Sequence, residues 1–436
     1  MTGEIARAAA SHYAFRPMTS LDPGTAASGG VRFLGNARVY WRLLMRGAAL
    51  LMVTLGIYRF WLTTDVRRFL WANTEVAGES LEYTGTPLEL LVGFLIAIAI
   101  LIPVYAGFFV AALDLGTLGK LSGVLAFAAL GLIGQYAIYR ARRYRLTRTI
   151  YRGVRFHQSG SAWRYAFCAV FWWSLTALTC GLAYPFQIAS LERYKMRNTF
   201  YGDLAGSFAG SGFRLFVRGF PMWLMVFAPL ALTVGAFIDV VDWKALADAA
   251  EHGGSDVMSR IEGSNPGLAS VIVFAMLMGS VAACAAALLY PAFQALILRW
   301  WSSGLRFGEL EMRSSLRTRQ VYGAYMRFLW YAILFSIVMA VIGFIALVAV
   351  GLLAGNDKTG TGGEIVATGI LLVGYVVAAL GFSTIYRATV MLSLWQLGME
   401  SLQLSGLSAL DRVKASGGPS SPLGEGLADA LNLGGY

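Results

Sequence analysis

Residues 328–354 read FLWYAILFSIVMAVIGFIALVAVGLLA and contain no charged side chain. About 20 apolar residues in a helix cross a hydrocarbon core roughly 30 Å thick, so this stretch is long enough to span a membrane. Membrane-spanning strands would instead alternate apolar and polar residues over about 10 positions, and no such alternation occurs here. Five other stretches are comparably apolar: 88–113, 121–139, 220–238, 267–298 and 364–386. We therefore expect an all-α polytopic membrane protein with about six transmembrane helices.

The overall composition agrees with this interpretation. Hydrophobic residues make up 57% of the 436 positions and charged residues 14%, against about 25% charged in a typical soluble domain. The net charge of +11 fits basic loops beside an anionic leaflet better than it fits nucleic acid, so we expect no nucleic-acid partner. Cys168, Cys180 and Cys284 lack any C-x-x-C spacing, which is typical of isolated apolar cysteines.

The chain divides into three parts. Residues 1–30 are rich in Ala, Ser and Gly and carry no recognisable cleavable signal, so we expect a disordered leader. Residues 31–394 are predicted to form the membrane domain. Residues 395–436 are expected to be a C-terminal tail that is largely disordered.

Two stretches, about 31–90 and 154–213, resemble each other. In both, 14 residues separate a Thr from an Arg, and 17 residues separate that Arg from a Gly. Partial copies occur at 140–163 and 299–327. Such spacing indicates an internal repeat, and hence a body built from one supersecondary unit used several times. Each copy ends in short Gly-bounded segments that we expect to form turns or hairpins.

The repeated residues are the candidate functional set. Arg and aromatic side chains together are typical of a membrane–water interface, and Arg can pair with lipid phosphate while its stem covers apolar surface. We therefore expect membrane lipids with anionic headgroups, or a membrane-protein partner, to bind there; a purely structural role for these residues remains the alternative. The set comprises Arg68, Asn73, Gly78, Arg143, Gly153, Arg193, Asn198 and Gly202.

Two apolar runs, 43–62 and 166–190, can be interpreted in two ways. If 166–190 crossed the membrane once, its two basic flanks, 140–164 and 191–218, would lie on opposite sides. If both runs are instead re-entrant or interfacial helical hairpins that turn at Gly56 and Gly181, every strongly basic loop faces the cytoplasm, as the positive-inside rule favours. The second interpretation places both termini in the cytoplasm and the acidic 239–263 loop outside.

The sequence offers little for catalysis. The six apolar segments are almost free of ionisable residues, which are the usual functional groups inside a membrane. His12, His157 and His252 are scattered, and no catalytic or phosphate-binding motif is present. We expect no enzyme activity, no metal and no cofactor.

Thr54-Leu-Gly-Ile-Tyr58, Arg68 to Gly78, Tyr83-Thr-Gly85 and Val154-Arg-Phe156 resemble the YjgN family, a group of bacterial inner-membrane proteins with a domain of unknown function. The resemblance covers roughly residues 30–400. It implies an inner-membrane location and a multi-span helical body, but it carries over no substrate, cofactor or catalytic residue. The chain departs from the pattern at Arg148, where the other copies have Asn.

Two functional classes remain open from the sequence. One is a membrane scaffold, or an envelope protein that interacts with lipid or a partner through its basic, aromatic inner face. The other is a small-solute transporter or channel, since many transporters are built from pseudo-repeats. A polar cavity at the membrane midplane would favour transport, whereas apolar packing would favour the scaffold.

Overall fold

A computed structural model places the elements of the chain. It describes residues 30–113, 117–244, 247, 263, 265, 267–353 and 361–416. Residues 1–29 of the predicted leader, most of the predicted 239–263 loop and the last 20 residues lie outside the described residues.

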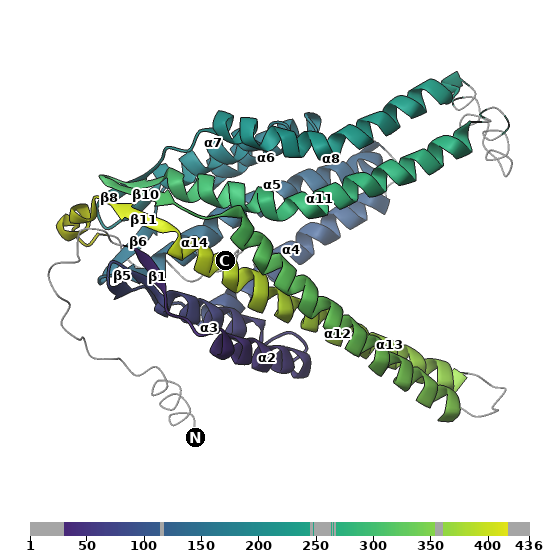
Figure 1. Cartoon of the computed structure of the whole chain (residues 1–436), viewed down its shortest axis with the longest axis horizontal. Coiled ribbons are helices and arrows are strands. Elements are labelled where there is room, and N and C mark those ends of the chain that lie inside the picture. The colour runs from purple at the N-terminus through teal and green to yellow at the C-terminus, as the bar shows by residue number, and fades with distance from the viewer. Residues whose placement is uncertain are drawn as a thin grey trace.

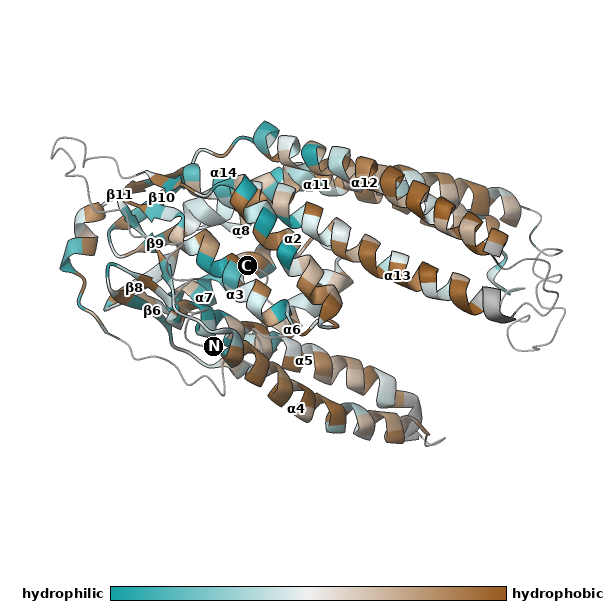
Figure 2. Cartoon of the chain, turned by 90° about the horizontal axis from the view of Figure 1, so that it is seen from below, coloured by the Kyte–Doolittle hydropathy of each residue, from teal (hydrophilic) through white to brown (hydrophobic). Residues whose placement is uncertain are grey.

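Each of the six apolar segments lies on one long helix, and all six helices are long and apolar enough to cross a membrane. The prediction of about six candidate spans is therefore confirmed, and Figure 2 shows the hydrophobic residues concentrated along these helices. The helices are α4 (Pro87–Leu113), α5 (Thr117–Thr147), α8 (Gly212–Val240), α11 (Leu268–Gly304), α12 (Thr318–Leu353) and α13 (Thr361–Tyr386).

The long helices pack as the pairs α4–α5, α8–α11 and α12–α13. The pairs diverge as they leave the strands at one end of the molecule (Figure 1). At most 11% of any apolar window is buried inside the protein. Most of this apolar surface must therefore face something other than the chain itself, as lipid-facing helices do.

Two shorter helical hairpins occupy the ambiguous apolar runs. Helices α2 (Ala37–Val53) and α3 (Arg59–Ala72) form the first, and α6 (Ala162–Leu178) and α7 (Tyr184–Arg197) the second. The chain turns where a break was expected, with φ of 92° at Gly56 and 90° at Gly181. Glycine adopts this left-handed conformation without steric cost, and the two hairpins turn in the same way.

The protein is mostly helical, as expected, but short strands connect the helices, so the all-α prediction holds only in part. Eleven short strands are present among the described residues: β1 (Val31–Phe33), β2 (Thr74–Val76), β3 (Glu79–Ser80), β4 (Glu82–Tyr83), β5 (Thr149–Tyr151), β6 (Val154–Gln158), β7 (Thr199–Tyr201), β8 (Leu204–Phe208), β9 (Leu305–Phe307), β10 (Leu310–Ser314) and β11 (Leu402–Ser405). With two to five residues each, they are too short to show a clear period of two.

The strands follow one another in a closed order, which we call the strand ring. One sheet has the order β1-β2-β3 and the other β11-β10-β9-β8-β7-β6-β5-β4, with antiparallel neighbours. Only Leu81 separates β3 from β4, and a bridge between Gly30 and Gln403 joins β1 to β11. The chain passes five times from a strand through a helical hairpin and back to a strand.

Part of the expected disordered tail is ordered. Helix α13 continues through the π-helical turn η1 (Arg387–Met391) into α14 (Leu392–Glu400), and β11 then pairs with β10. The 3₁₀ helix η2 (Leu407–Arg412) follows, and its Leu410 is buried in the same cluster as the ring side chains. Long-range pairing orders residues 395–412, which local composition could not indicate.

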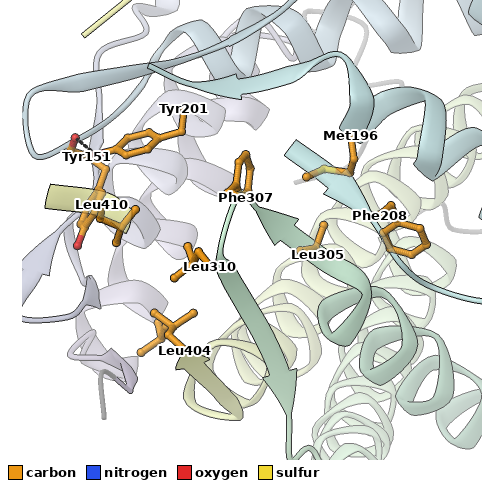
Figure 3. Close-up of a cluster of buried hydrophobic side chains, with 10 residues drawn as sticks. Tyr151, Met196, Tyr201, Phe208, Leu305, Phe307, Leu310, Leu404 and Leu410 are labelled. Atoms are coloured by element: carbon orange, nitrogen blue, oxygen red, sulfur yellow. Dashed lines mark hydrogen bonds between the residues drawn. The ribbon is translucent and has the colours of Figure 1, made fainter. Parts of the chain in front are cut away.

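Side chains fill the strand ring. Figure 3 shows Tyr151, Tyr201, Phe307 and Leu404 gathered from different strands into one buried cluster. The Tyr151 hydroxyl donates to the Val76 carbonyl at 2.9 Å, and the Tyr201 hydroxyl donates to the Tyr151 carbonyl at 2.9 Å. Burial raises the pKa of Tyr201 to about 12, so these phenols stay neutral donors. The ring is thus a packed core.

Candidate functional site: the arginine junctions

The three repeated arginines make the same contact. Each donates from Nη2 to the carbonyl oxygen of the glycine 17 residues later, at 2.9 Å for Arg68, 2.6 Å for Arg143 and 3.2 Å for Arg193. The acceptors are Gly85, Gly160 and Gly210. We call each contact, with the helix that carries the Arg and the helix that follows the Gly, an arginine junction.

Each junction sets the start of the next helix. The accepting glycines lie two residues before α4, α6 and α8. The hydroxyl that follows each glycine accepts from a backbone N–H of that helix, as Ser161 and Ser211 do from Arg164 and Arg214 at 3.4 Å. A hydroxyl at this position satisfies a donor that the first helical turn leaves unpaired. The arginine thus ties the end of one helix to the beginning of another.

The two asparagines of the set close the helices that carry the arginines. Asn73 Nδ2 donates to the Phe69 carbonyl and Asn198 Nδ2 to the Tyr194 carbonyl, each at 2.7 Å. Each amide gives a carbonyl of the last helical turn a side-chain donor, and the Phe69 carbonyl also accepts from the Asn73 backbone N–H at 3.2 Å. Both residues therefore have a local structural role.

Arg148 replaces the asparagine in the second junction and makes a different contact. Its Nη2 lies 3.0 Å from Glu89 Oε1, and the Tyr144 hydroxyl donates to Glu89 Oε2 at 2.6 Å. The Arg148 side chain is 10% exposed and the Glu89 side chain 20%. Glu89 lies in the first turn of α4, the helix that follows the first junction. Arg148 directly follows α5, the helix that carries Arg143. The pair therefore joins helices of different junctions. This departure from the repeated pattern is a compensated substitution.

The three glycines of the set lie elsewhere. Gly78, Gly153 and Gly202 have φ of 90°, 73° and 57° and occupy two-residue turns between paired strands. Short hairpin loops require such positive φ values. These turns are at the opposite ends of the strands from the arginine junctions. The predicted set therefore forms two structural groups rather than one site.

A charged cluster that sequence reasoning missed lies beside the third junction. Glu192 and Lys195 on α7 form an ion pair, and Trp301 Nε1 of α11 donates to Glu192 Oε2 at 3.3 Å. Burial acts to raise the pKa of the Glu192 carboxyl, but Lys195 and Arg142 outweigh it and lower that pKa below its usual value. Glu192 thus pairs with Lys195 within α7 and, through Trp301, joins α7 to α11.

Two pockets lie where the helices meet the strand ring. One, of about 480 Å³, is mostly apolar and includes Leu70, Phe293 and Leu394. The other, of about 820 Å³, lies between α2 and α12 and carries Arg38, Arg42 and Arg327. Sequence reasoning did not select these arginines. The available signal was that Arg327 directly precedes the uncharged stretch 328–354.

Comparison with known protein families identifies the family of this chain. Residues 28–430 match the family model described as bacterial protein of unknown function (DUF898). The chain belongs to this family. The match spans nearly the whole chain, including all helices and strands described above, and it confirms the resemblance stated from the sequence.

No curated protein and no solved structure matches the chain. Family membership and the six candidate spans together support an integral, multi-pass bacterial membrane protein.

Proposed function

We propose that this family member is a scaffold of the bacterial inner membrane whose basic, aromatic face interacts with anionic lipid headgroups or with a membrane-protein partner. The observation that carries the proposal is the contrast between the two ends of the molecule. Three apolar helix pairs extend from the strand ring, and arginines are concentrated where the helices enter the ring, as in Arg42, Arg68 and Arg193. Such a surface suits the boundary of an anionic leaflet.

The proposed orientation puts the strand ring in the cytoplasm. Both ends of the described chain lie at the ring, since Gly30 bridges to Gln403 and the Lys414 N–H donates to Asp203. Basic residues dominate the segments that enter the ring, whereas the 239–263 loop is acidic. The positive-inside rule therefore supports cytoplasmic termini.

The two short hairpins are proposed to dip into the membrane without crossing it. Helix α2 has 17 residues, about 25 Å at 1.5 Å per residue, and Arg38, Arg42 and Arg46 occupy its first part. The remaining apolar part is too short for a core of about 30 Å. The tips are apolar and exposed, with Leu55 93% and Leu178 82% exposed.

We also propose that the five strand–hairpin–strand passages arose as internal repeats. The common arginine junctions and the common turns at Gly56 and Gly181 support this. A transporter or channel is the alternative, because such proteins often use repeated units. The scaffold is favoured because the six apolar segments of the long helices carry almost no charged residues and side chains fill the strand ring. The proposal includes no enzymatic step and no cofactor.

Lipid retention tests the function. Native mass spectrometry of the purified protein should show retention of phosphatidylglycerol over phosphatidylcholine. Replacing Arg68, Arg143 and Arg193 together by Gln should reduce that preference several-fold, since each basic group near an anionic surface contributes about 1 kcal/mol. Equal retention of both lipids by the unaltered protein would contradict the proposal. An unchanged preference in the triple variant would leave these arginines as junction residues only.

Thiol labelling tests the orientation. Single cysteines at Ser255 and Ser159 in a cysteine-free variant should differ in reactivity toward a membrane-impermeant reagent added outside intact cells. We expect Ser255→Cys to react and Ser159→Cys to stay unlabelled until the membrane is opened. Labelling of Ser159→Cys from outside would overturn the proposed topology.

A further inference from the structure

The pocket between α2 and α12 has the features of a built anion site. It has a volume of about 820 Å³ and is lined by Arg38 and Arg42 from α2, Arg327 and Tyr331 from α12, and Ser393 from α14. Two helices that are distant in the sequence, α2 and α12, thus bring three guanidinium groups to one pocket, and α14 adds the hydroxyl of Ser393. The volume lies within the roughly 300–1,000 Å³ usual for small-molecule sites.

Among the residues that the structure describes, the positive charge of this pocket has no acidic counter-charge. None of its lining residues is Asp or Glu. Within the described residues, no ion pair involves Arg38, Arg42 or Arg327. By contrast Arg46, one turn after Arg42, lies 3.6 Å from Asp65. All three side chains are exposed in the protein, so a ligand at the surface can reach them. Like charges that share a pocket repel, and an anion between them would reduce that repulsion.

The pocket lies at the boundary of the apolar zone. Arg327 is the last charged residue before the uncharged part of α12, and residues 365–386 of its partner α13 are uncharged as well. Trp41 and Tyr331 line the same pocket, and such aromatic side chains are enriched where hydrocarbon meets headgroups. This position suits headgroup depth, and the lining combines apolar side chains with the polar Thr389, Ser393 and Gln396.

Two features hold the pocket in shape. Arg327 Nη2 donates to Ser393 Oγ at 3.1 Å, and its Nε donates to the Gly323 carbonyl at 3.3 Å. The π-helical turn η1 contributes Ala388 and Thr389 to the lining. Short π-helical turns inside α-helices are frequent at functional sites. The Arg327 side chain is thus positioned before any ligand arrives.

We propose that this pocket binds the phosphate-bearing headgroup of one anionic phospholipid from the leaflet next to the strand ring. Guanidinium groups bind phosphate oxygens in a bidentate manner, and basic pockets between membrane helices bind anionic headgroups. The site rests on the proposed function and specifies its ligand class. It is separate from the three arginine junctions, none of whose arginines lines the pocket.

The test compares pocket variants with a matched control. The unaltered protein, Arg42→Gln, Arg327→Gln and the double variant are each placed in nanodiscs of mixed phosphatidylglycerol and phosphatidylcholine and examined by native mass spectrometry. We expect loss of one tightly retained phosphatidylglycerol, about fivefold per guanidinium removed, equivalent to about 1 kcal/mol. Arg164→Gln is the control, because Trp163-Arg164 lies in the first turn of α6 and Trp41-Arg42 in the second turn of α2, yet Arg164 does not line the pocket.

The outcomes separate the hypotheses. Retention that falls in the double variant, stays normal in Arg164→Gln and persists in excess inorganic phosphate would support a lipid site. Displacement of the lipid by inorganic phosphate would overturn it in favour of a soluble anion. Unchanged retention in the double variant would reject this pocket, whereas the absence of any anionic preference in the unaltered protein would reject the proposed function. Arg42→Lys, which keeps the charge, should retain most of the lipid and exclude a folding defect as the cause.

Discussion

The second and third arginine junctions follow one plan and differ at two positions. Arg143 and Arg193 each reach a glycine carbonyl 17 residues later, and a serine then caps the next helix. Five residues after the arginine, however, the second junction has Arg148 and the third has Asn198. The hairpin turns also differ in their surroundings, at Gly153 and at Gly202.

The first difference is between a contact within one helix and a contact between two parts of the chain that are distant in the sequence. Asn198 bonds to a carbonyl in its own helix, and this contact would form in any helix ending in that way. Arg148 instead pairs with Glu89 at the start of α4. A largely buried charge is costly without its partner, so Arg148 is acceptable only because the fold brings Glu89 to it.

The second difference depends on the C-terminal segment. An added Cβ at Gly153 would meet no atom within 4 Å, whereas at Gly202 it would overlap the backbone oxygen of Lys414. Both glycines have positive φ. Both turns therefore require a residue that adopts a positive φ, whereas only the turn at Gly202 also packs closely against the C-terminal tail.

The largest effect is expected from breaking the Arg148–Glu89 pair. Glu89→Gln leaves a largely buried guanidinium without its carboxylate and should lower the free energy of unfolding by about 3 kcal/mol. The double variant Glu89→Gln/Arg148→Asn, which recreates the asparagine of the third junction, should recover much of that loss. Thermal unfolding in detergent, followed by intrinsic tryptophan fluorescence, measures both.

Glu311→Gln provides the control, since Glu311 pairs with Arg306 at 3.2 Å on a more exposed surface. Its loss should cost below about 1 kcal/mol. The double variant could instead be no more stable than Glu89→Gln alone. The two residues would then not be coupled, and Glu89 would not be what makes Arg148 acceptable at this position.

A smaller effect is expected at the turns. Gly153→Ala places a residue with a Cβ in the left-handed conformation without any overlap. It should lower the free energy of unfolding by about 1 kcal/mol. Gly202→Ala adds the overlap with Lys414 and should cost about twice as much or release the tail from the ring. Limited proteolysis after residue 406, with thermal unfolding in parallel, distinguishes these results. Equal effects at both glycines would show that the tail does not pack on the third turn.

The sequence predicted the spacing of each junction but not its chemistry. The 17-residue interval from Arg to Gly was visible as a pattern, and the structure shows that a hydrogen bond from the guanidinium to the glycine carbonyl spans the strands between them. The arginines were expected to face lipid, yet one Nη2 of each is committed to the protein. Arg38 and Arg327 could not be grouped from the sequence, because nearly 290 residues separate them.

What the sequence determined by itself is local: six apolar stretches long enough to cross a membrane, and the two glycine breaks in the shorter hairpins. Both depend on neighbouring residues, through apolar length and backbone sterics. The strand ring, the partner of Arg148, the order in the tail and the basic pocket were decided by tertiary structure. Each depends on residues far apart in the chain, and strands of two to five residues gain stability only from pairing with one another.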